Sequence, residues 1–556
     1  MSDPSTQKTG WLFVAAAKGI QGYVLRSDKL KEMVGASELV DELPKLLKEL
    51  LPRIAPPPHH YEVLSDVSGS VRVLFSEEEK ARQLARLWPV AVSRFAPGLE
   101  SVGAVISCVG NPVAAVRDGE EALVRHRNRP SASLPPAGPF ALRNRRTGLP
   151  ATVAVNDDGQ LYLDQEAWRK RQTASRPWSL ERGPAHAPSY AHWHLLGKVV
   201  PEEFDDWLRT VQFIKDAWPL NFDEIVSGEN RYLAIVHADA NGLGSAVMKL
   251  VEHLNRNPHE AGNFYLAFSN AVKTALEGAV RKALIPVCNA AREEMRKSPG
   301  KNRSARVPMR PIVCAGEDIT MVLRADLAVK FVHDLLVEFE MQSKAEFVKA
   351  EIPGLQEGLT ACAGVVFCKS HYPFAQAYAV AESMCKFAKE QTHREASAVA
   401  IHRITTSQTP GENYQDILRE ELSTRDTKPR FLSMNPYIVG GKDPDGHPML
   451  RDLIKLCGDA RKLPRGAQRE MIAQSYDSHE QADRAFERLR HVAESRSKES
   501  KENWESFSES LKTLSGGGLW TNKEPLRTPL YDALELQDFL EQDFLDDATI
   551  NSLFTP

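Results

Sequence analysis

The chain has 556 residues, of which 42% are hydrophobic and 26% are charged, and its formal net charge at pH 7 is -4. This length exceeds what one hydrophobic core usually organises, so several domains are expected. The composition is that of an ordinary soluble protein and excludes neither nucleotide nor nucleic-acid binding. No apolar run of about eighteen residues occurs, which excludes a membrane-spanning helix, and the N-terminal segment MSDPSTQKTG has no signal-type apolar core, which predicts a cytoplasmic protein.

The seven cysteines are scattered along the chain without a C-x-x-C pair. Several of them fall in apolar runs, which is typical of reduced core residues. A zinc site built from cysteines is therefore not expected.

The first part of the chain predicts a ferredoxin-like α+β unit over residues 1–124. A strand from Trp11 enters a glycine turn, and apolar residues at helical spacing predict a helix over Leu30–Leu50. Two short strands, a helix and a last strand complete the order strand, helix, hairpin, helix, strand that is typical of this fold. Their ranges are Tyr61–Leu64, Val71–Phe75, Glu77–Trp88 and Ser101–Val109.

Residues 125–229 are interpreted as a basic linker or insertion. Arg125–Arg146 is rich in arginine, proline and serine, which predicts a loop. A nucleic-acid contact and a solvated linker explain this composition equally well, and the same holds for the basic segment Arg296–Arg310.

The same order of elements returns over residues 230–405, and this second unit is better defined. Helical spacing of apolar residues fills the intervals between its predicted strands. This is the order of a polymerase-type palm, so two related palm-like units are predicted. The strands of the second unit are expected at Tyr232–His237, Ile312–Cys314, Ile319–Leu323, Leu359–Phe367 and Ser397–Ile404.

Three acidic residues at the ends of these strands, Asp239, Glu317 and Asp318, are the candidate catalytic and metal-binding residues. Carboxylates brought together repel one another unless cations neutralise them, and carboxylate oxygens suit Mg²⁺ or Mn²⁺. Positioned ions supply most of the catalysis in nucleotidyl transfer. The sequence therefore predicts a two-metal site that activates a ribose 3′-hydroxyl for attack on an α-phosphate. A helix N-cap at Asp239 and an ordinary polar turn at Glu317 and Asp318 are the alternatives.

Residues near these acids are candidates for binding a nucleotide. Glycines let backbone approach phosphate closely, and Lys389 is placed to reach a triphosphate from the end of its helix. Plain turns at the glycines and a solvated helix end at Lys389 are the alternatives. The predicted nucleotide-binding residues are Asn241, Gly242, Gly244, Ser245, Gly316 and Lys389.

Residues 406–556 predict a helical C-terminal domain. Apolar residues recur at helical spacing from Leu450 to Leu489, whereas the polar segment Glu494–Gly518 is predicted to be partly flexible. The acidic segment Leu534–Asp547 is either a docking helix or a solvated face. A domain of this kind docks a partner more often than it performs chemistry.

The motifs resemble those of a known family. HADANGLG (His237–Gly244) is similar to the D-x-[DN]-x-[LM]-G strand end, and AGED (Ala315–Asp318) to the G-G-D-D hairpin, of the large polymerase/cyclase subunit of type III CRISPR effector complexes. The palm also resembles that of GGDEF-type diguanylate cyclases. Three further stretches match in order, so the resemblance covers nearly the whole chain: Gly19–Val40, Gly364–Glu390 and Leu450–Ile472.

The resemblance implies two palm domains, a helical C-terminal domain and, in active members, synthesis of cyclic oligoadenylates from ATP in antiviral defence when target RNA is bound. It implies effector subunits and guide RNA as partners, and no membrane. The N-terminal HD nuclease domain of many members is not expected, because the first strand begins at Trp11. The cysteine zinc ribbon is not expected either, because Pro139–Thr152 keeps its outline without cysteines.

The sequence departs from the family pattern in two places. Ala315 stands for the first hairpin glycine and Glu317 for the first hairpin aspartate. The first unit ends its strand in Ala15–Lys18 and offers only Asp66 in its hairpin, so one active palm is predicted. Two other functions stay open: a non-catalytic scaffold subunit of a CRISPR ribonucleoprotein, and a freestanding synthase of a cyclic dinucleotide.

Overall fold

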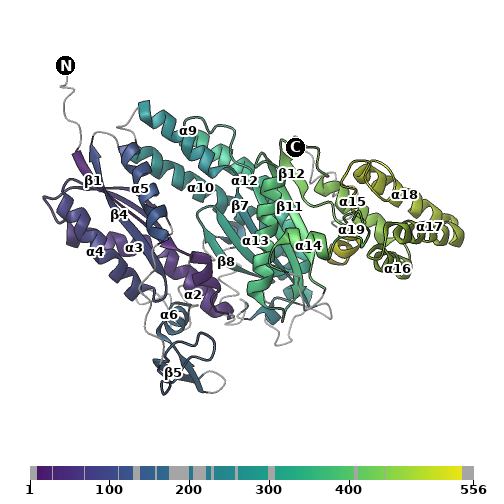
Figure 1. The fold of residues 1–556 in the computed structure, drawn as a ribbon, viewed down its shortest axis with the longest axis horizontal. Helices are drawn as coiled ribbons and strands as arrows, with labels where there is room; N and C mark the ends of the chain where they lie inside the picture. The colour runs from purple at the N-terminus through teal and green to yellow at the C-terminus, as the bar shows by residue number, and fades with distance from the viewer. Residues whose placement is uncertain are drawn as a thin grey trace.

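The computed structural model describes residues 9–27, 29–67, 69–109, 112–128, 138–156, 160–174, 199–204, 219, 221–226, 231–256, 261–297, 307–405, 411–443 and 445–540. The N-terminal sheet lies at one end of the molecule, the second sheet in the middle and the C-terminal helices at the other end (Figure 1). The predicted α+β class, with two ferredoxin-like units and a helical C-terminal region, is confirmed.

The first sheet has four antiparallel strands in the order β2-β3-β1-β4. Its strands are β1 Thr9–Lys18, β2 Tyr61–Val67, β3 Ser70–Phe75 and β4 Glu100–Val109. Its helices are α1 Ile20–Leu25, α2 Leu30–Asp41, α3 Leu43–Ile54, α4 Glu78–Phe95 and α5 Pro112–Arg127. Because side chains alternate along a strand, Phe13 and Ala15 pack with α2, α3 and α4, whereas Leu12 and Val14 pack with α5 on the other face.

The helical prediction over Leu30–Leu50 is confirmed, but the structure divides this stretch into two helices, α2 and α3. Pro44 stands in the first turn of α3. Proline fits that position because the first N–H groups of a helix have no partner inside the helix, but the same residue cannot continue α2.

The second sheet has six strands in the order β12-β11-β10-β7-β9-β8. Its strands are β7 Tyr232–Ala240, β8 Met309–Ala315, β9 Asp318–Arg324, β10 Ala361–Lys369, β11 Ala396–Arg403 and β12 Tyr437–Gly441. The helices on it are α9 Leu243–Arg256, α10 Ala261–Ala283, α11 Ile285–Lys297, α12 Ala325–Lys349 and α13 Phe374–Gln391. Helix α13 packs on the face opposite α10 and α12, and only β10 and β11 pair in parallel. The short strand β12 was not predicted from the sequence.

The two sheets are joined by helices that cover their edges. Helix α10 packs along β2, and α2 packs against β8 (Figure 1). Both buried apolar clusters contain side chains from both sheets. The first unit therefore supports the edge of the second sheet that carries the acidic hairpin.

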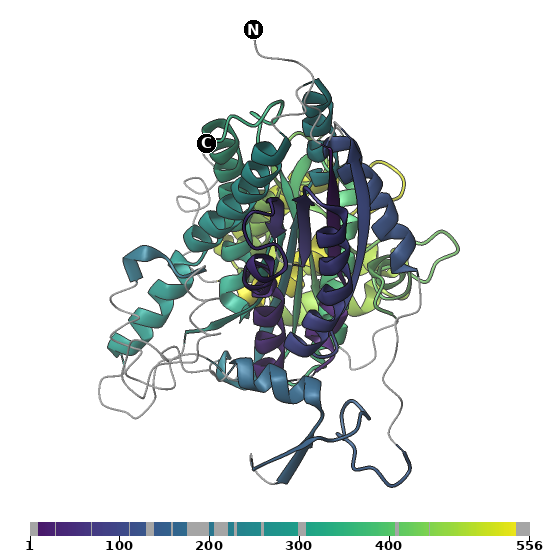
Figure 2. The same cartoon turned by 90° about the vertical axis from the view of Figure 1, so that its left-hand side faces the viewer.

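Part of the predicted linker is ordered and forms β5 Val153–Asn156, β6 Gln160–Leu163 and α6 Gln165–Ala174. The β5–β6 hairpin projects away from the sheets beyond α6 (Figure 2). Helix α6 is fixed to the first unit by Lys170, whose Nζ donates to the carbonyl oxygen of Tyr23 and to Glu166, each at 2.6 Å. Arg125, predicted as the start of a loop, lies in the last turn of α5, and residues 129–137 of the basic segment and 298–306 of the second one lie outside the described residues.

The contact between α2 and α6 leaves no room for a side chain at Gly35. A Cβ atom there would lie 1.9 Å from the carbonyl oxygen of Lys170. We expect Gly35→Ala to lower the free energy of unfolding by about 1–3 kcal/mol, because backbone would have to move. Gly22→Ala, in α1 with nothing within 4 Å, is the control and is expected to be neutral or slightly stabilising in thermal unfolding. Equal melting temperatures for the two variants would contradict the close packing.

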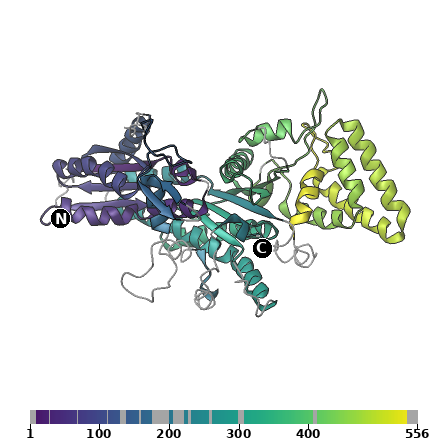
Figure 3. The same cartoon turned by 90° about the horizontal axis from the view of Figure 1, so that it is seen from below.

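The C-terminal helices form a separate layer at the far end of the molecule (Figure 3). The prediction that Glu494–Gly518 is partly flexible is wrong, because most of it is helix α18, whose Trp504, Phe507 and Leu511 are buried in the core. None of the helices in the described residues is long and apolar enough to cross a membrane. The helices of this region are α14 Tyr414–Glu420, α15 Leu450–Arg461, α16 Arg465–Ser475, α17 His479–Arg496, α18 Lys498–Ser515 and α19 Leu530–Leu536.

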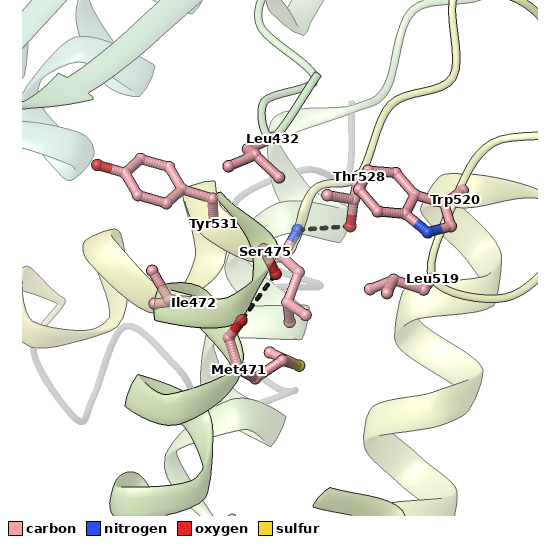
Figure 4. Close-up of a pocket in the computed structure, with 9 residues that line it drawn as sticks. Leu432, Met471, Ile472, Ser475, Leu519, Trp520, Thr528 and Tyr531 are labelled. Carbon is pink, nitrogen blue, oxygen red and sulfur yellow. Dashed lines mark hydrogen bonds between the residues drawn. The ribbon is translucent and has the colours of Figure 1, made fainter. Parts of the chain in front are cut away.

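An apolar hollow of about 270 Å³, which includes space open to solvent, lies between α16 and the segment that follows α18 (Figure 4). Leu432, Met471 and Trp520 line it. The hydroxyls in its wall are engaged locally: Ser475 donates to the carbonyl oxygen of Met471, and Thr528 accepts from the N–H of Leu530.

Candidate functional site

The structure brings Asp239 and Asp318 face to face. They are directly opposed residues of the antiparallel strands β7 and β9, so their side chains leave the same face of the sheet. Asp318 follows a tight turn in which Gly316 adopts φ 64, a conformation that other L-residues rarely adopt. Asp239 lies inside β7 and α9 begins only at Leu243, so the alternative of a helix N-cap at Asp239 is excluded.

The crowding of the carboxylates changes their protonation. Burial, and then the charges of Asp239 and Glu317, raise the pKa of Asp318 to about 8. Burial and the charge of Asp239 also raise the pKa of Glu317. Without a cation, Asp318 therefore keeps its proton at neutral pH.

Glu317 lies at the turn, beside an apolar wall. With Asp239 it lines a hollow of about 220 Å³, which includes space open to solvent, together with Leu276, Leu335 and Phe339. Glu317 and the strand end at Asp239 therefore adjoin an apolar surface on the α10 and α12 side of the sheet.

Lys389 neutralises Asp239 on the other face of the sheet, which is the face that α13 covers. It lies in the last turn of α13, is buried, and its Nζ donates to the carboxylate of Asp239 and, at 2.8 Å, to the carbonyl oxygen of Ala240. The alternative of a solvated helix end is therefore wrong. The side chain balances one of the negative charges at the strand ends.

We expect Lys389→Met to lower the free energy of unfolding by about 1–2 kcal/mol at pH 8 in EDTA, because Asp239 would lose its buried partner. Lys386→Met is the matched control, since Lys386 lies one turn earlier on α13 and its side chain is 75% exposed. Thermal unfolding should show a change of less than about 0.5 kcal/mol for the control. Equal destabilisation by both substitutions would show that the Asp239 contact contributes nothing.

A polar layer that sequence reasoning missed lies beneath the acids. His237 contacts Thr320 through its Nδ1 at 3.2 Å, and its ring meets Tyr378 edge-on with centroids 5.5 Å apart. Burial lowers the pKa of His237 to about 4, so the ring is neutral. Two signals could have found these residues: His237 is two residues before Asp239 on the same strand face, and Tyr378 is three helical turns before Lys389.

The residues after Asp239 divide into an open loop and a buried brace. Gly242, Gly244 and Ser245 are partly or fully exposed at the start of α9, and the two glycines have open space around them. Asn241, in contrast, is buried, and its Nδ2 donates to Thr360 Oγ1 at 3.0 Å and to the carbonyl oxygen of Ala396 at 2.9 Å. Its carboxamide holds the strand ends together.

The first unit also reaches the site. Glu382 of α13 accepts a hydrogen bond from Gln21 of α1, and the charge of Asp239 contributes to a raised pKa of Glu382, after the effect of burial. Gln21 of the first unit therefore holds a further carboxylate, that of Glu382, within the electrostatic influence of Asp239.

The corresponding place in the first sheet carries no acidic pair. Strand β1 pairs with β3 as β7 pairs with β9, and its last opposed residues are Ala16 and Ser70. The side chain of Asp66 lies outside the described residues. The opposed carboxylates belong to the second sheet.

The acidic pair fits a divalent ion that is bound together with a nucleotide. Among the residues that the structure describes, no group of three or more His, Cys, Asp or Glu side chains is arranged to hold a metal ion by itself. Mg²⁺ needs only one or two protein carboxylates when phosphate oxygens and water complete its shell. Burial and the charges of Asp239 and Glu317 raise the pKa of Asp318, and a cation bound at this place would offset both effects.

Two further features named from the sequence are the cysteines and the acidic C-terminal segment. All seven cysteines are buried and free, as predicted. The acidic segment Leu534–Asp547 is helical in its first residues, within α19, whereas residues 541–547 lie outside the described part.

Comparison with known proteins finds a family model that is similar to part of the second unit. Residues 232–398 match the family model described as Cas10/Cmr2, second palm domain. No curated protein matches the chain.

Solved structures of related fold share little sequence with the chain. A Csm1-Csm4 cassette in complex with cA4 matches at 12% identity and TM-score 0.41, over 74% of this chain and 58% of that chain. Csm1 of T.onnurineus matches at 12% identity and TM-score 0.47, over 96% and 70%. A Csm1-Csm4 cassette in complex with pppApApA matches at 11% identity and TM-score 0.50, over 96% and 69%. At these identities the likeness concerns the fold. Residues 232–398 are therefore similar to the second palm domain of the Cas10/Cmr2 family.

Proposed function

We propose that this protein is a metal-dependent nucleotidyl cyclase that makes cyclic oligoadenylates from ATP in a type III CRISPR-like antiviral system. The observation that carries the proposal is the opposition of Asp239 and Asp318 within a unit similar to the Cas10/Cmr2 second palm domain. The presence of cA4, AMPPNP and pppApApA in solved Csm1-Csm4 cassettes supports adenine nucleotides as the substrate class.

In this proposal Asp239 and Asp318 hold Mg²⁺ or Mn²⁺, with Glu317 as the further ligand. When bound, the ions neutralise the triphosphate and activate the ribose 3′-hydroxyl. The backbone of Gly242, Gly244 and Ser245 faces the phosphates at the start of α9, where N–H groups favour an anion.

The other residues of the predicted set act around this centre. Lys389 exchanges its hydrogen bond with Asp239 for one with the triphosphate once cations are present. Gly316, which has no side chain, lets phosphate approach the backbone of the turn closely. Asn241 holds the loop after Asp239 in place. His237 and Tyr378 support the acids from below. The proposed partners are RNA-guided effector subunits with guide and target RNA in the cytoplasm, supported by the occurrence of related chains in Csm1-Csm4 complexes.

The test is mass spectrometry of products after incubation with ATP and Mg²⁺ or Mn²⁺, with the protein alone and after assembly with its effector subunits and target RNA. Cyclic oligoadenylate in any of these conditions supports the proposal. A cyclic dinucleotide made by the protein alone favours a freestanding synthase. ATP binding without any product favours a scaffold subunit. The observation behind this alternative is that the first sheet has no opposed acidic pair at the end of β1 and β3.

A further inference from the structure

The outer edge of β4 carries no further strand in the part of the chain that the structure describes. Strand β4 is the last strand of the first sheet. The N–H of Ala17 donates to the carbonyl oxygen of Gly69, so odd-numbered residues of β1 point their backbone groups toward β3. Both backbone groups of a residue in an antiparallel strand point to the same side, so the even-numbered residues of β1 point theirs toward β4. Since Val14 pairs with Ala104, the even-numbered residues of β4 point their N–H and C=O groups toward β1. The odd-numbered residues of β4 point theirs toward the outer edge.

A second observation supports this assignment. The carbonyl oxygen of Gly103 contacts His126 Nδ1 of α5 at 2.8 Å, which places Gly103 on the outward side. The other outward residues are Ser101, Val105, Ser107 and Val109, and no backbone hydrogen bond to their outward groups occurs within the described part of the chain.

The other three edges of the two large sheets are protected, and β4 is not. Strand β2 is covered by α10 and its pairing is interrupted near Val63, and β8 is covered by α2 and contains Pro311. Strand β12 has five residues, and its pairing with β11 shifts register. Strand β4, in contrast, runs through ten paired residues without a shift or a proline. Natural proteins interrupt, charge or cover exposed edges, so a long regular edge is a place for pairing.

We propose that β4 pairs with β4 of a second copy of this chain, antiparallel and around a twofold axis. The strand suits itself as a partner, because its only charged residue is Glu100 at one end, where it is 3.2 Å from Lys18. Antiparallel self-pairing centred on Val105 sets Gly103 of one copy against Ser107 of the other. The outward N–H and C=O groups of one copy then meet those of the other. No like charges oppose each other in this register.

The surroundings of the edge fit such a contact. Val109 at the end of β4 and Val124 of α5 are exposed large apolar side chains, at 65% and 60% exposure. The bond from His126 does not exclude a partner strand, because a carbonyl oxygen has two lone pairs. Two four-stranded sheets would join into one continuous sheet.

The interface is one strand pair with a narrow rim, which is smaller than a standard stable interface. Dimerisation is therefore expected to depend on concentration, with a dissociation constant on the order of 10 μM. Neither the dimer nor its test depends on the proposed catalytic function.

The test is the molar mass of the purified chain by light scattering and analytical ultracentrifugation over about a hundredfold range of concentration. The mass of the wild type is expected to approach twice the monomer mass at the upper end. Ser107→Pro removes an outward N–H donor without touching the β1–β4 ladder, and Ser107→Lys keeps the N–H but adds a charge at the edge. Both variants are expected to stay monomeric.

Ser107→Ala, which keeps the backbone donor and adds no charge, is the matched control and should dimerise as the wild type does. Hydrogen exchange at Val105–Val109 should slow with concentration in the wild type and in the control only. A wild type that stays monomeric throughout, or a dimer that persists in a folded Ser107→Lys variant, would overturn the proposal.

Discussion

Replacement of Asp318 by asparagine is expected to reduce the formation of cyclic oligoadenylate at least about a thousandfold, and Asp239→Asn to do the same. Each substitution keeps the size of the side chain and removes an anionic oxygen ligand from the opposed pair. Loss of a metal ligand in nucleotidyl transfer removes stabilisation of the transition state, so the rate of product formation should fall under saturating ATP. Product is quantified by mass spectrometry under the conditions in which the wild type is active.

The control is Asp118→Asn, the same chemical change on the exposed surface of α5, where Asp118 lies 3.2 Å from Arg117. It should retain wild-type activity. Activity within tenfold of the wild type in both acidic-pair variants would show that these residues do not carry the chemistry. An inactive wild type in every condition would instead reject the cyclase function itself.

Asp318→Asn is also expected to stabilise the protein in the absence of divalent cations. The pKa of Asp318 in the folded chain is about 8, well above its ordinary value of 3.8. Between these two values the folded chain binds more protons than the unfolded chain, so the free energy of unfolding falls as the pH rises from about 4 to about 8. The asparagine variant does not lose stability in this way. Its free energy of unfolding should exceed that of the wild type by about 2–4 kcal/mol at pH 8 in EDTA.

The measurement is urea unfolding of both proteins at several pH values, with and without Mg²⁺. Asp532, buried in the C-terminal region with its pKa raised to about 7, titrates in the same range, but it is present in both proteins and cancels in the difference. Mg²⁺ should raise the stability of the wild type more than that of the variant, because a bound ion replaces the proton. Identical pH profiles for the two proteins would refute the crowding of the acids.

Local patterns in the sequence were sufficient for the fold class and for most elements of the second unit. Alternation and helical spacing are properties of neighbouring residues, and they predicted the strands that became β7, β9, β10 and β11. Where a pattern was short or polar, prediction failed. The five-residue strand β12 carries too few alternating residues, and α18 hides a narrow apolar stripe within a charged segment.

For the candidate site, the sequence by itself determined which residue types stand at the strand ends, because Asp239, Glu317 and Asp318 come at the ends of apolar runs that predict strands. Only the tertiary structure decided their relations. The register of β7 against β9 opposes two of the acids, the packing of α13 brings Lys389 to Asp239, and the burial of Asn241 makes it a brace. These contacts join residues far apart in the chain, and their geometry depends on strand register and helix packing, which are set by the whole core and not by any local stretch of sequence.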